Sequence, residues 1–519
     1  MKQSILTLIF LLTTLITLQA QIKPKNVNVK WGPEMKEPAR STITDIIAGD
    51  NGQIFTIRIK GSGLFNVKYL IETYNESLRM TSVKDLDLVY HGKELAYEFA
   101  LYSNEKLYVF ASLNNQKTKK NTLFAQELDT KSLQPKGKMT KIIEADSRSK
   151  SNDGGFDYEV SKDKSKIAIL AFSAYEKKAP DKFNIAVLNQ DVNILWNKSI
   201  KLPYSDELYN SEIFRVDNEG SCYMQGVLFK DKAKAKRKGK PNYSYLIHSY
   251  RDKGETTSQY KVALKDRFIT DLNFKINKRG EIVCAGFYSD QGTYTIKGTY
   301  LIRINQETGE KEVAKTKEFG KDFLTEVLSD KQIRKGKQEL YEYDLDKLIL
   351  RDDGGAVLLA EQYYVRVSRT NRRSPNGGMI TDTRYYYYYN DIIVININPD
   401  GSIEWLTKVP KRQVTVDDGG YFSSFADMIT GEKIYLIFND NPKNLGIKDS
   451  RRVYAFNGKK SVVTLAAISQ DGTYEKSLLF SNKDQAVITR PKVCEQISKD
   501  EMLLYGELRK KFRLANVNF

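Results

Sequence analysis

Eight times along the chain, a tight turn rich in Asn, Asp, Gly, Lys or Glu leads directly into a short apolar strand. The eight segments are DNGQIFTIRI (50–59), NEKLYVFASL (104–113), DKSKIAILAF (163–172), NEGSCYMQGVLF (218–229), KRGEIVCAGF (278–287), DDGGAVLLAE (352–361), TGEKIYLIF (430–438) and KDEMLLYGEL (499–508). Their spacing fits a four-stranded antiparallel unit with its loops. The pattern predicts an all-β chain made of repeated four-stranded blades, which is a β-propeller.

One repeat shows the expected strand order with particular clarity. Its four strands are FDYEVSK (156–162), KIAILAFSAY (166–175), FNIAVLNQ (183–190) and ILWNKSIKL (194–202), and turn residues of the Gly, Pro, Asn and Asp type separate them. The second and third strands are apolar at nearly every position, as expected where neighbouring sheets cover both faces. The fourth strand alternates and therefore indicates a blade edge.

The two ends of the chain predict how the propeller closes. The last repeat ends after a third strand, KFRLANVNF (511–519), whereas NVNVKWGPEMKEP (26–38) resembles a fourth strand, with Trp31 placed like Trp196 and Trp405. Pairing of the amino-terminal strand into the last blade would remove open edges. We therefore expect a single eight-bladed propeller closed in this way, or a seven-bladed one if the repeat that begins near Leu95 is irregular.

One segment departs from the all-β pattern. In KDFLTEVLSDKQIRKG (321–336) the apolar residues fall on one helical face, with Asp322 early and basic residues late. This pattern predicts a short capped helical insertion between two blades. The helix would cover apolar loop surface or, alternatively, act as a lid.

The first twenty residues resemble a secretory signal peptide. Lys2 precedes the apolar run ILTLIFLLTTLITL (5–18), and the small Ala20 suits a cleavage site before Gln21. The run is too short to favour the alternative, a retained membrane helix. We expect residues 1–20 to be a signal peptide and residues 21–519 to form the propeller domain. The protein would be exported to the periplasm or the cell surface, with no membrane span after processing.

Three cysteines are too few and too scattered for a disulfide framework. Cys222, Cys284 and Cys494 each lie within an apolar strand pattern, which predicts buried free thiols. A bridge between Cys222 and Cys284, in equivalent strands of adjacent repeats, is the alternative.

In its signal peptide and its eight turn-strand motifs the chain resembles exported bacterial β-propeller proteins of an uncharacterised family. The resemblance covers nearly the whole mature sequence and concerns architecture only. The repeated Trp-Asp dipeptides, the Ser-x-Asp-x-Gly-x-Thr-Trp boxes and the Trp docking motif of better-known propeller families are absent from the sequence. Because this fold supports many functions, the resemblance implies no activity.

Charge is distributed unevenly among the predicted loops. In a propeller the loops between second and third strands emerge on the same face as the blade-to-blade connections. Here those loops together carry more positive charge than the whole chain, whose net charge is +17, so the remaining residues sum to a net negative charge. A basic face concentrates anions. The anion-binding candidates are Lys117, Lys119, Lys120, Lys232, Lys234, Lys236, Arg237, Lys238, Arg366, Arg369, Arg372, Arg373, Arg451 and Arg452. The alternative is that these side chains only confer solubility.

The hairpin VRVSRTNRRSPNGGMITDTRYYYYY (365–389) combines arginines on its outgoing arm with five consecutive tyrosines on its return arm. Arg and Tyr suit planar anions or sugar rings. Cross-strand packing within the ribbon explains most of these tyrosines equally well.

Catalytic signals are weak. His91 and His248 are the only histidines, and no metal-ligand spacing or cofactor motif is present, so no metal and no cofactor is expected. Of the two, His91 lies in a blade-to-blade loop and His248 in a third strand. A glycosidase needs only two carboxylates, for which Asp153 with Asp157, or Asp417 with Asp418, are available. Each Asp-Gly-Gly is better explained as a turn with glycine at positive φ.

The sequence therefore favours an exported, non-enzymatic binding propeller whose basic face recognises an anionic envelope polymer, glycan or acidic protein. The alternatives are a structural component of an envelope assembly and a carbohydrate-active enzyme acting at the channel mouth. Nucleic acid fits the charge but is a less natural partner for an exported protein.

Overall fold

A computed structural model describes residues 24, 26–61, 67–328, 330–373 and 379–519. The chain divides into two compact units. Of the described residues, unit 1 contains those up to Lys36 together with those in 365–390 and 409–519, and unit 2 contains those in 37–364 and 391–408. Each unit is described separately below.

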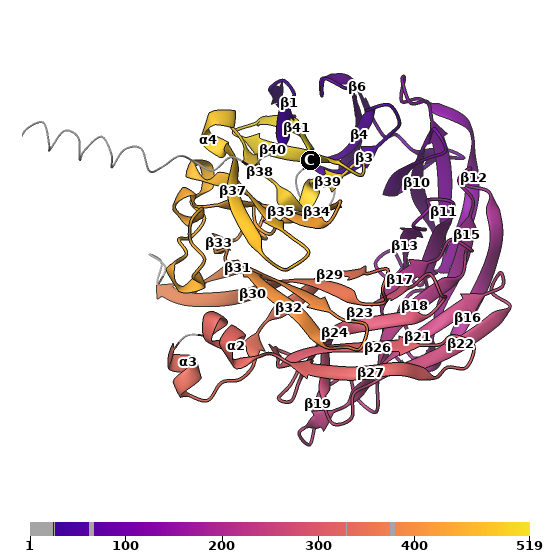
Figure 1. The fold of residues 1–519 in the computed structure, drawn as a ribbon. Helices are drawn as coiled ribbons and strands as arrows, with labels where there is room; N and C mark the ends of the chain where they lie inside the picture. Colours follow the sequence, from indigo (N-terminus) through magenta and orange to yellow (C-terminus); the bar gives the residue numbers. More distant parts are fainter. Residues whose placement is uncertain (1–23, 25, 62–66, 329, 374–378) are drawn as a thin grey trace, which may run out of the picture. The chain divides into compact units, whose positions relative to one another are not determined.

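Unit 2 consists of consecutive four-stranded antiparallel sheets, each a meander in chain order (Figure 1). The strands of the first three sheets are β3 (Ser41–Ala48), β4 (Ile54–Lys60), β5 (Lys68–Tyr74) and β6 (Met80–Asp85), then β9 (Ala96–Ser103), β10 (Lys106–Asn115), β11 (Lys120–Leu128) and β12 (Pro135–Asp146), then β13 (Gly155–Val160), β14 (Ile167–Phe172), β15 (Pro180–Leu188) and β16 (Ile194–Ser205). The next two sheets contain β17 (Tyr209–Val216), β18 (Cys222–Phe229), β21 (Tyr243–Arg251) and β22 (Thr256–Val262), then β23 (Phe268–Ile276), β24 (Ile282–Ser289), β26 (Gly298–Ile304) and β27 (Lys311–Glu318).

A further sheet has the order β29-β30-β31-β32, formed by β29 (Tyr343–Leu350), β30 (Ala356–Arg373), β31 (Met379–Ile397) and β32 (Ile403–Val409). Strands β30 and β31 are long enough to belong to both units. Residues 356–364 and 391–397 lie in unit 2, whereas 365–373 and 379–390 lie in unit 1. The strand β33 (Gln413–Val416), which the sequence did not predict, pairs with the unit 1 part of β31.

Unit 1 contains two more sheets of the same kind. The first has the order β34-β35-β36-β37, formed by β34 (Ala426–Thr430), β35 (Lys433–Asp440), β36 (Val462–Ile468) and β37 (Tyr474–Ser481). The second has the order β1-β41-β40-β38, formed by β1 (Asn28–Trp31), β41 (Lys511–Asn518), β40 (Glu501–Leu508) and β38 (Ile488–Thr489). Two short strands lie beside this path, β2 (Met35–Lys36) on β41 and β39 (Glu495–Gln496) on β40.

Apolar side chains hold consecutive sheets together face to face. The second and third strands of each sheet are almost continuously buried; Ile167–Phe172, for example, is buried at five of its six positions. One cluster joins β10 and β11 to β14 and β15 through Phe110, Leu123, Ile169 and Ala186, and similar clusters join the other consecutive pairs of sheets in unit 2. Four-stranded meanders packed in this way are the blades of a β-propeller. The predicted all-β architecture of four-stranded propeller blades is therefore confirmed.

All eight turn-strand segments form the second strand of a sheet. The repeat that begins near Leu95, expected to be the weakest, forms a full four-stranded sheet. Strand β1 pairs antiparallel with β41, with Trp31 opposite Ala515, so the amino-terminal segment supplies the fourth strand of its sheet as expected. Trp196 in β16 and Trp405 in β32 also lie in fourth strands.

The predicted single helix over 321–336 is wrong in detail. The structure has two short helices, α2 (Lys321–Val327) and α3 (Asp330–Arg334), and the residue before α2, Gly320, makes no side-chain cap. The apolar residues Phe323, Leu324 and Val327 pack on the buried cluster shared by the last two sheets of unit 2. The segment therefore covers apolar surface, the simpler of the two roles expected from the sequence.

Cys222, Cys284 and Cys494 are free thiols, as predicted, and the alternative bridge between Cys222 and Cys284 is absent. Cys222 and Cys284 are buried as expected, whereas Cys494 is only partly buried. Burial raises the pKa of the Cys284 thiol to about 12, which makes it a poor nucleophile. The predicted signal peptide, residues 1–20, lies outside the described residues. Among the residues described, we find no helix with the length and apolar character that crossing a membrane requires.

Candidate anion-binding site

Four of the predicted anion-binding residues come together at one pocket in unit 2. Between β18 and β21 the chain forms a small hairpin of β19 (Lys236–Arg237) and β20 (Lys240–Pro241). A cavity of about 200 Å³ in this loop is lined by Asp231, Lys232, Lys234, Lys236, Arg237 and Asn242. The buried Asn242 shapes the loop, because its side-chain amide donates to the Asp231 carboxylate at 3.0 Å and to the Lys232 carbonyl at 3.1 Å.

The cations of this pocket are not equivalent. Arg237 forms an ion pair with Asp231. Lys236 donates to the Gln291 carbonyl at 2.6 Å and lies 5.7 Å from the centre of the Phe268 ring, so it anchors the loop to the next sheet. For Lys232 and Lys234, the described residues provide no carboxylate partner, and both side chains are exposed. Lys232 and Lys234 are thus the cations best placed to meet a ligand.

Several basic residues at this end of unit 2 form ion pairs with acidic residues of neighbouring loops. The sheet-to-sheet connections emerge beside the second-to-third loops and pair with them. Arg148 contacts Glu176 at 2.5 Å, Lys240 contacts Asp266 at 2.9 Å, and Lys177 contacts Glu207 at 3.4 Å. The positive charge available to a ligand is therefore concentrated in a few loops instead of being spread over all of them.

The candidates Lys117, Lys119 and Lys120 lie in the turn between β10 and β11, two sheets away from the pocket. Lys120 pairs with Asp146 at 2.6 Å, and the Lys119 ammonium donates to the Arg148 carbonyl at 2.9 Å. Lys117 is exposed. These three residues do not line the cavity, and Lys238 lies at the tip of the hairpin beside it.

The remaining candidates lie in unit 1. Arg366 and Arg369 are exposed on β30, and Arg372 and Arg373 end this strand. Asp449 partly neutralises the other two candidates, Arg451 and Arg452. The Arg451 guanidinium donates to both Asp449 oxygens, at 3.0 and 3.2 Å, and Arg452 lies 3.7 Å from the same carboxylate. The position of Asp449 two residues before Arg451 in the sequence already indicated this neutralisation.

The five tyrosines of β31 have different surroundings. Tyr386 to Tyr389 pair in register with β33. Tyr389 is buried, and its hydroxyl accepts from Lys492 at 2.6 Å. Tyr388 lies 5.3 Å from the Arg366 guanidinium. Tyr385 is the most exposed of the five. Packing within the ribbon thus accounts for most of the tyrosine run.

The candidate catalytic residues make local structural contacts. His248 is buried in β21 beside the rings of Tyr204 and Tyr209, and burial lowers its pKa to about 4. His91 is an exposed turn residue with φ of 47°. The Asp153 carboxylate accepts from the Asn114 amide at 2.9 Å, and the Asp157 carboxylate accepts from the Tyr158 backbone at 2.8 Å.

The Asp-Gly-Gly segments are turns, as predicted. Gly154, Gly419 and Gly420 all have positive φ. Asp417 accepts from the Tyr385 backbone N–H at 2.8 Å, and Asp418 accepts from the Gly420 backbone N–H at 2.9 Å. No group of three or more His, Cys, Asp or Glu side chains is placed to hold a metal ion in the described part of the chain.

One repeated feature of unit 2 was not predicted from the sequence. In five of its sheets the first strand contains one residue more than its partner strand at the same point, which is a β-bulge. The bulged residues are Thr44, Glu98, Glu212, Thr270 and Asp346. Burial raises the pKa of Glu98 and Glu212, and raises the pKa of the neighbouring Asp271 to about 7. The first strands thus bring carboxylates into poorly solvated surroundings.

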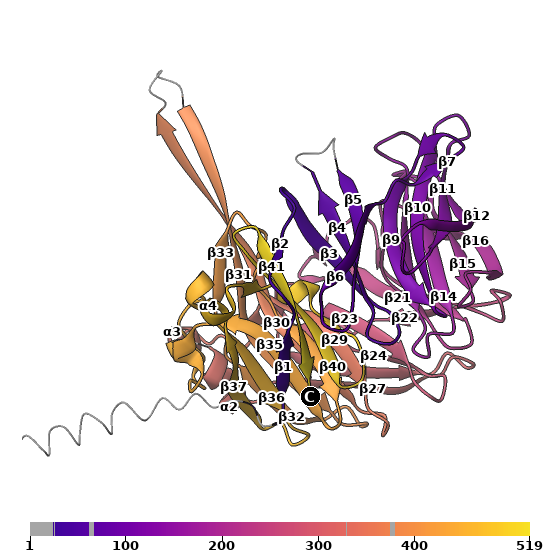
Figure 2. The same ribbon diagram turned by 90° about the horizontal axis from the view of Figure 1, so that it is seen from above.

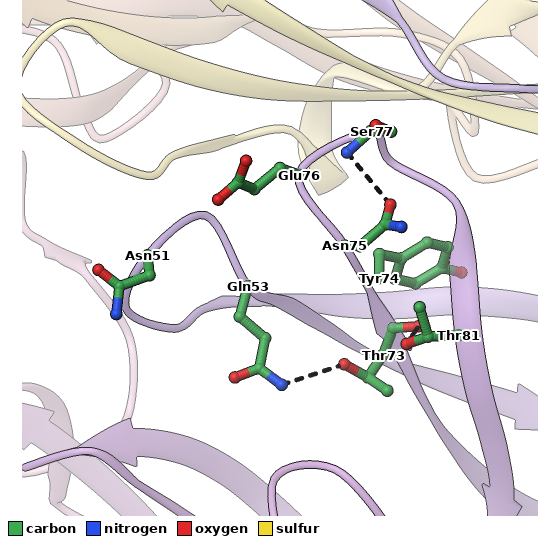
Figure 3. Close-up of a pocket in the computed structure, with 8 residues that line it drawn as sticks. All are labelled: Asn51, Gln53, Thr73, Tyr74, Asn75, Glu76, Ser77 and Thr81. Atoms are coloured by element: carbon green, nitrogen blue, oxygen red, sulfur yellow. Dashed lines mark hydrogen bonds between the residues drawn. The ribbon is translucent and has the colours of Figure 1, made fainter.

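A second and larger pocket lies at the opposite end of the first sheet in unit 2 (Figure 3). Its volume is about 410 Å³, and it is lined by Asn51, Gln53, Thr73, Tyr74, Asn75, Glu76, Ser77 and Thr81. The Gln53 amide donates to the Thr73 hydroxyl at 3.5 Å, and the Ser77 backbone donates to the Asn75 side chain at 3.1 Å. Glu76 is the one charged residue of the lining, so this pocket does not suit an anion.

Comparison with known proteins gives no family assignment. No protein-family model matches the chain, and no curated protein is detectably similar. Among solved structures, the WD40 domain of SCAP from fission yeast is similar at 10% identity, with 95% of each chain covered and a TM-score of 0.41. The β-propeller domain of the Trilobed protease from Pyrococcus furiosus has 11% identity and a TM-score of 0.35, over 86% of this chain and 97% of that one. A Pyrococcus horikoshii acylaminoacyl peptidase has 11% identity and a TM-score of 0.34, over 90% of this chain and 58% of that one. Similarities as weak as these support no conclusion about function.

Proposed function

We propose that the protein is an exported, non-enzymatic binding or scaffold propeller that recognises an anionic partner through the second-to-third loops of its blades. In this proposal residues 1–20 are the export signal, and the eight sheets form one ring closed by the pairing of β1 with β41. The pairing itself and the meander order of the sheets support the ring. The partner is an envelope polymer, a glycan or an acidic protein.

The observation that carries the proposal is the pocket in the 230–242 loop. Residues 230–240 contain seven basic side chains and one acidic side chain. The loop is held in place by Asn242 and by the contact between Lys236 and Gln291, so its charge is presented on an ordered scaffold. Anchoring lowers the entropic cost of binding. The exposed Lys232 and Lys234 then supply charge-assisted hydrogen bonds to a carboxylate, sulfate or phosphate group.

The test uses immobilised polygalacturonate, a carboxylated polysaccharide, and measures retention of the full chain as salt is increased. We expect retention to fall with salt, because exposed charges are screened. Replacing Lys232 and Lys234 together by Ala should weaken binding roughly threefold to tenfold at low salt. The matched control is the double change Lys162→Ala and Lys164→Ala, which removes the same charge from an exposed turn at the opposite end of unit 2.

Two results would contradict the proposal. Retention that does not depend on salt would show that charge is not the basis of binding. Equal losses in the pocket variant and the control variant would show that net charge alone matters, and that the 230–242 loop is not a recognition site.

A further inference from the structure

Over its outer half, strand β30 has no paired strand on its β29 side among the described residues, and we call this side the open edge. The pairing of β30 with β29 ends at Gln362, opposite Tyr343. Beyond this point the described residues place only β31 beside β30, and β33 lies on the far side of β31. Figure 2 shows β30 and β31 continuing together as a narrow ribbon. The stretch from Val365 to Arg373 spans about 30 Å, enough to pair with another strand.

The backbone direction along this edge follows from one hydrogen bond. The Tyr363 N–H donates to the Glu342 carbonyl at 3.0 Å, on the side of β30 that β29 occupies. Alternate residues of a strand direct their backbone groups to the same side. Val365, Val367, Arg369 and Asn371 therefore direct their N–H and C=O groups toward the open edge.

Side chains on the two faces of the ribbon differ in chemistry. The Thr381 hydroxyl donates to Asn371 at 2.9 Å, which places the odd-numbered residues of β30 on one face. This face includes Val365 and Val367, which are 39% and 50% exposed. Arg366 stacks on Tyr388 on the other face. A strand added to the edge would thus meet Val365, Val367 and the cationic Arg369 on one face and the cationic Arg366 on the other.

The charge of the ribbon indicates which kind of strand could pair with the β30 edge. Residues 365–389 contain five arginines and one aspartate. A second copy of this chain would bring arginine against arginine, whereas an acidic segment would be attracted. Charged side chains also protect edge strands from unwanted pairing, which disfavours self-association further.

We propose that the β30 edge from Val365 to Asn371 binds an extended acidic segment of a partner protein by strand addition. The proposal rests on the anionic-partner function above and narrows that partner to a polypeptide. Main-chain hydrogen bonds supply affinity in this mode, and alternate side chains supply specificity. The expected segment alternates acidic residues, placed opposite Arg366, with apolar residues, placed opposite Val365 and Val367.

The experiment uses the full chain and a fluorescent ten-residue peptide of alternating glutamate and valine. We expect saturable binding in fluorescence anisotropy, weakened by salt. The same peptide with N-methyl groups on alternate amides keeps its charge but loses strand donors, and it should bind at least tenfold more weakly. A lysine–valine peptide should not bind. Hydrogen exchange of the 365–371 amides should slow when the glutamate–valine peptide is added.

Protein variants locate the site. Arg366→Glu should reduce affinity for the peptide at least tenfold, because it places a carboxylate on the face that the peptide glutamates occupy. The double change Lys162→Ala and Lys164→Ala, in an exposed turn of unit 2, alters the charge equally and should leave the affinity unchanged. The N-methyl comparison leaves the protein intact, so it remains decisive if Arg366→Glu folds poorly.

The possible results separate this proposal from the broader one. Polygalacturonate binding without peptide binding, or equal binding of the methylated peptide, would overturn strand addition and leave the proposed function standing. Failure of both probes would overturn both proposals. A concentration-dependent dimer that is lost in Arg366→Glu would show that the edge binds a second copy instead.

Discussion

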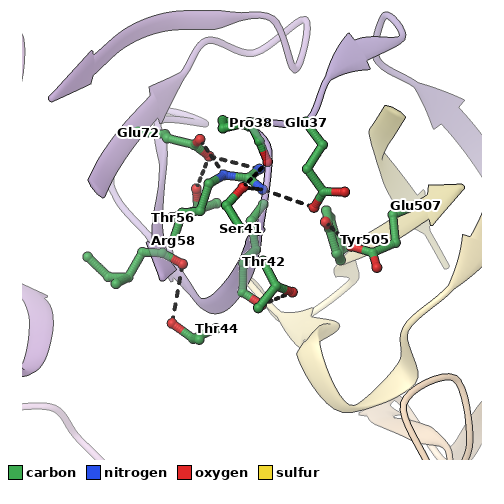
Figure 4. Close-up of polar contacts among 12 residues, drawn as sticks. Glu37, Pro38, Ser41, Thr42, Thr44, Thr56, Arg58, Glu72, Tyr505 and Glu507 are labelled. Atoms are coloured by element: carbon green, nitrogen blue, oxygen red, sulfur yellow. Dashed lines mark hydrogen bonds and ion pairs between the residues drawn. The ribbon is translucent and has the colours of Figure 1, made fainter. Parts of the chain in front are cut away.

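Arg58 and Glu72 form an ion pair inside the first sheet of unit 2, with both side chains fully buried and 2.7 Å between Arg58 Nε and Glu72 Oε1 (Figure 4). The Thr56 hydroxyl donates to the same carboxylate at 2.8 Å, and the Tyr74 hydroxyl donates at 2.6 Å. Glu37 provides a second carboxylate for Arg58 at 3.1 Å. Because every charge in this cluster has partners, burial of the pair is tolerated.

Replacing Arg58 by Met should therefore be strongly destabilising. The change leaves the Glu72 carboxylate buried without its cation, which costs roughly 3 to 5 kcal/mol of unfolding free energy. Urea denaturation of the full chain measures the loss. The same substitution at Arg148, whose pair with Glu176 is exposed, should have a much smaller effect. Similar losses for both variants would show that the buried pair contributes no more than a surface pair.

Gly286 occupies a position on β24 where no side chain fits. A Cβ atom there would lie 2.1 Å from the Asp271 carbonyl oxygen, which belongs to the paired strand β23. Gly286→Ala should thus force the strands apart at a cost of roughly 1 to 3 kcal/mol. Gly292→Ala, in the loop after the same strand, meets no atom within 4 Å and is the matched control. Thermal unfolding compares the two, and equal midpoints would show that β24 adjusts without cost.

The strands could be predicted from the sequence because the information for them is local. Each turn-strand segment contains both its turn residues and its apolar run, and all eight became second strands. The strand β33 could not be predicted, because Gln413–Val416 is a strand only through its pairing with the tyrosines of β31. The division of the helical insertion could not be predicted either, because no glycine or proline marks the end of α2 at Val327.

The candidate site was predictable only in part. The density of lysines in 230–240 identified the loop, but its fold depends on contacts with Gln291 and Phe268, which lie far away in sequence. The neutralisation of Lys240 by Asp266 also needs the fold, because it joins two loops. The bulges of the first strands were also not predicted, because no turn residues mark them and they depend on the pairing of two strands.

His248 should make stability depend on mildly acidic pH. Its folded pKa is about 4, below the usual 6.5, because the imidazole is buried. As pH falls from about 6.5 to 4, the unfolded chain takes up a proton that the folded chain excludes, so the unfolding free energy falls by about 3 kcal/mol. Unfolding free energies of wild type and His248→Gln, measured across this range, should therefore diverge. An equal change in the curve of His91→Gln, at the exposed histidine, would contradict burial as the cause.

Asp271 should make the unfolding free energy depend on pH in the opposite direction. Burial, together with the nearby Asp344 and Glu212, raises its folded pKa from 3.8 to about 7, although the Leu345 N–H donates to the carboxylate at 2.7 Å. The folded chain binds this proton first as pH falls, so the contribution of Asp271 becomes more favourable between pH 7 and 4. Above pH 7 the charged carboxylate remains buried, and Asp271→Asn removes that cost while keeping an acceptor for Leu345. The variant should gain up to about 4 kcal/mol over wild type at pH 9, and the gain should shrink toward pH 5. Denaturation at both pH values measures it, with Asp266→Asn at an exposed ion pair as the control; a gain that does not vary with pH would exclude titration of Asp271.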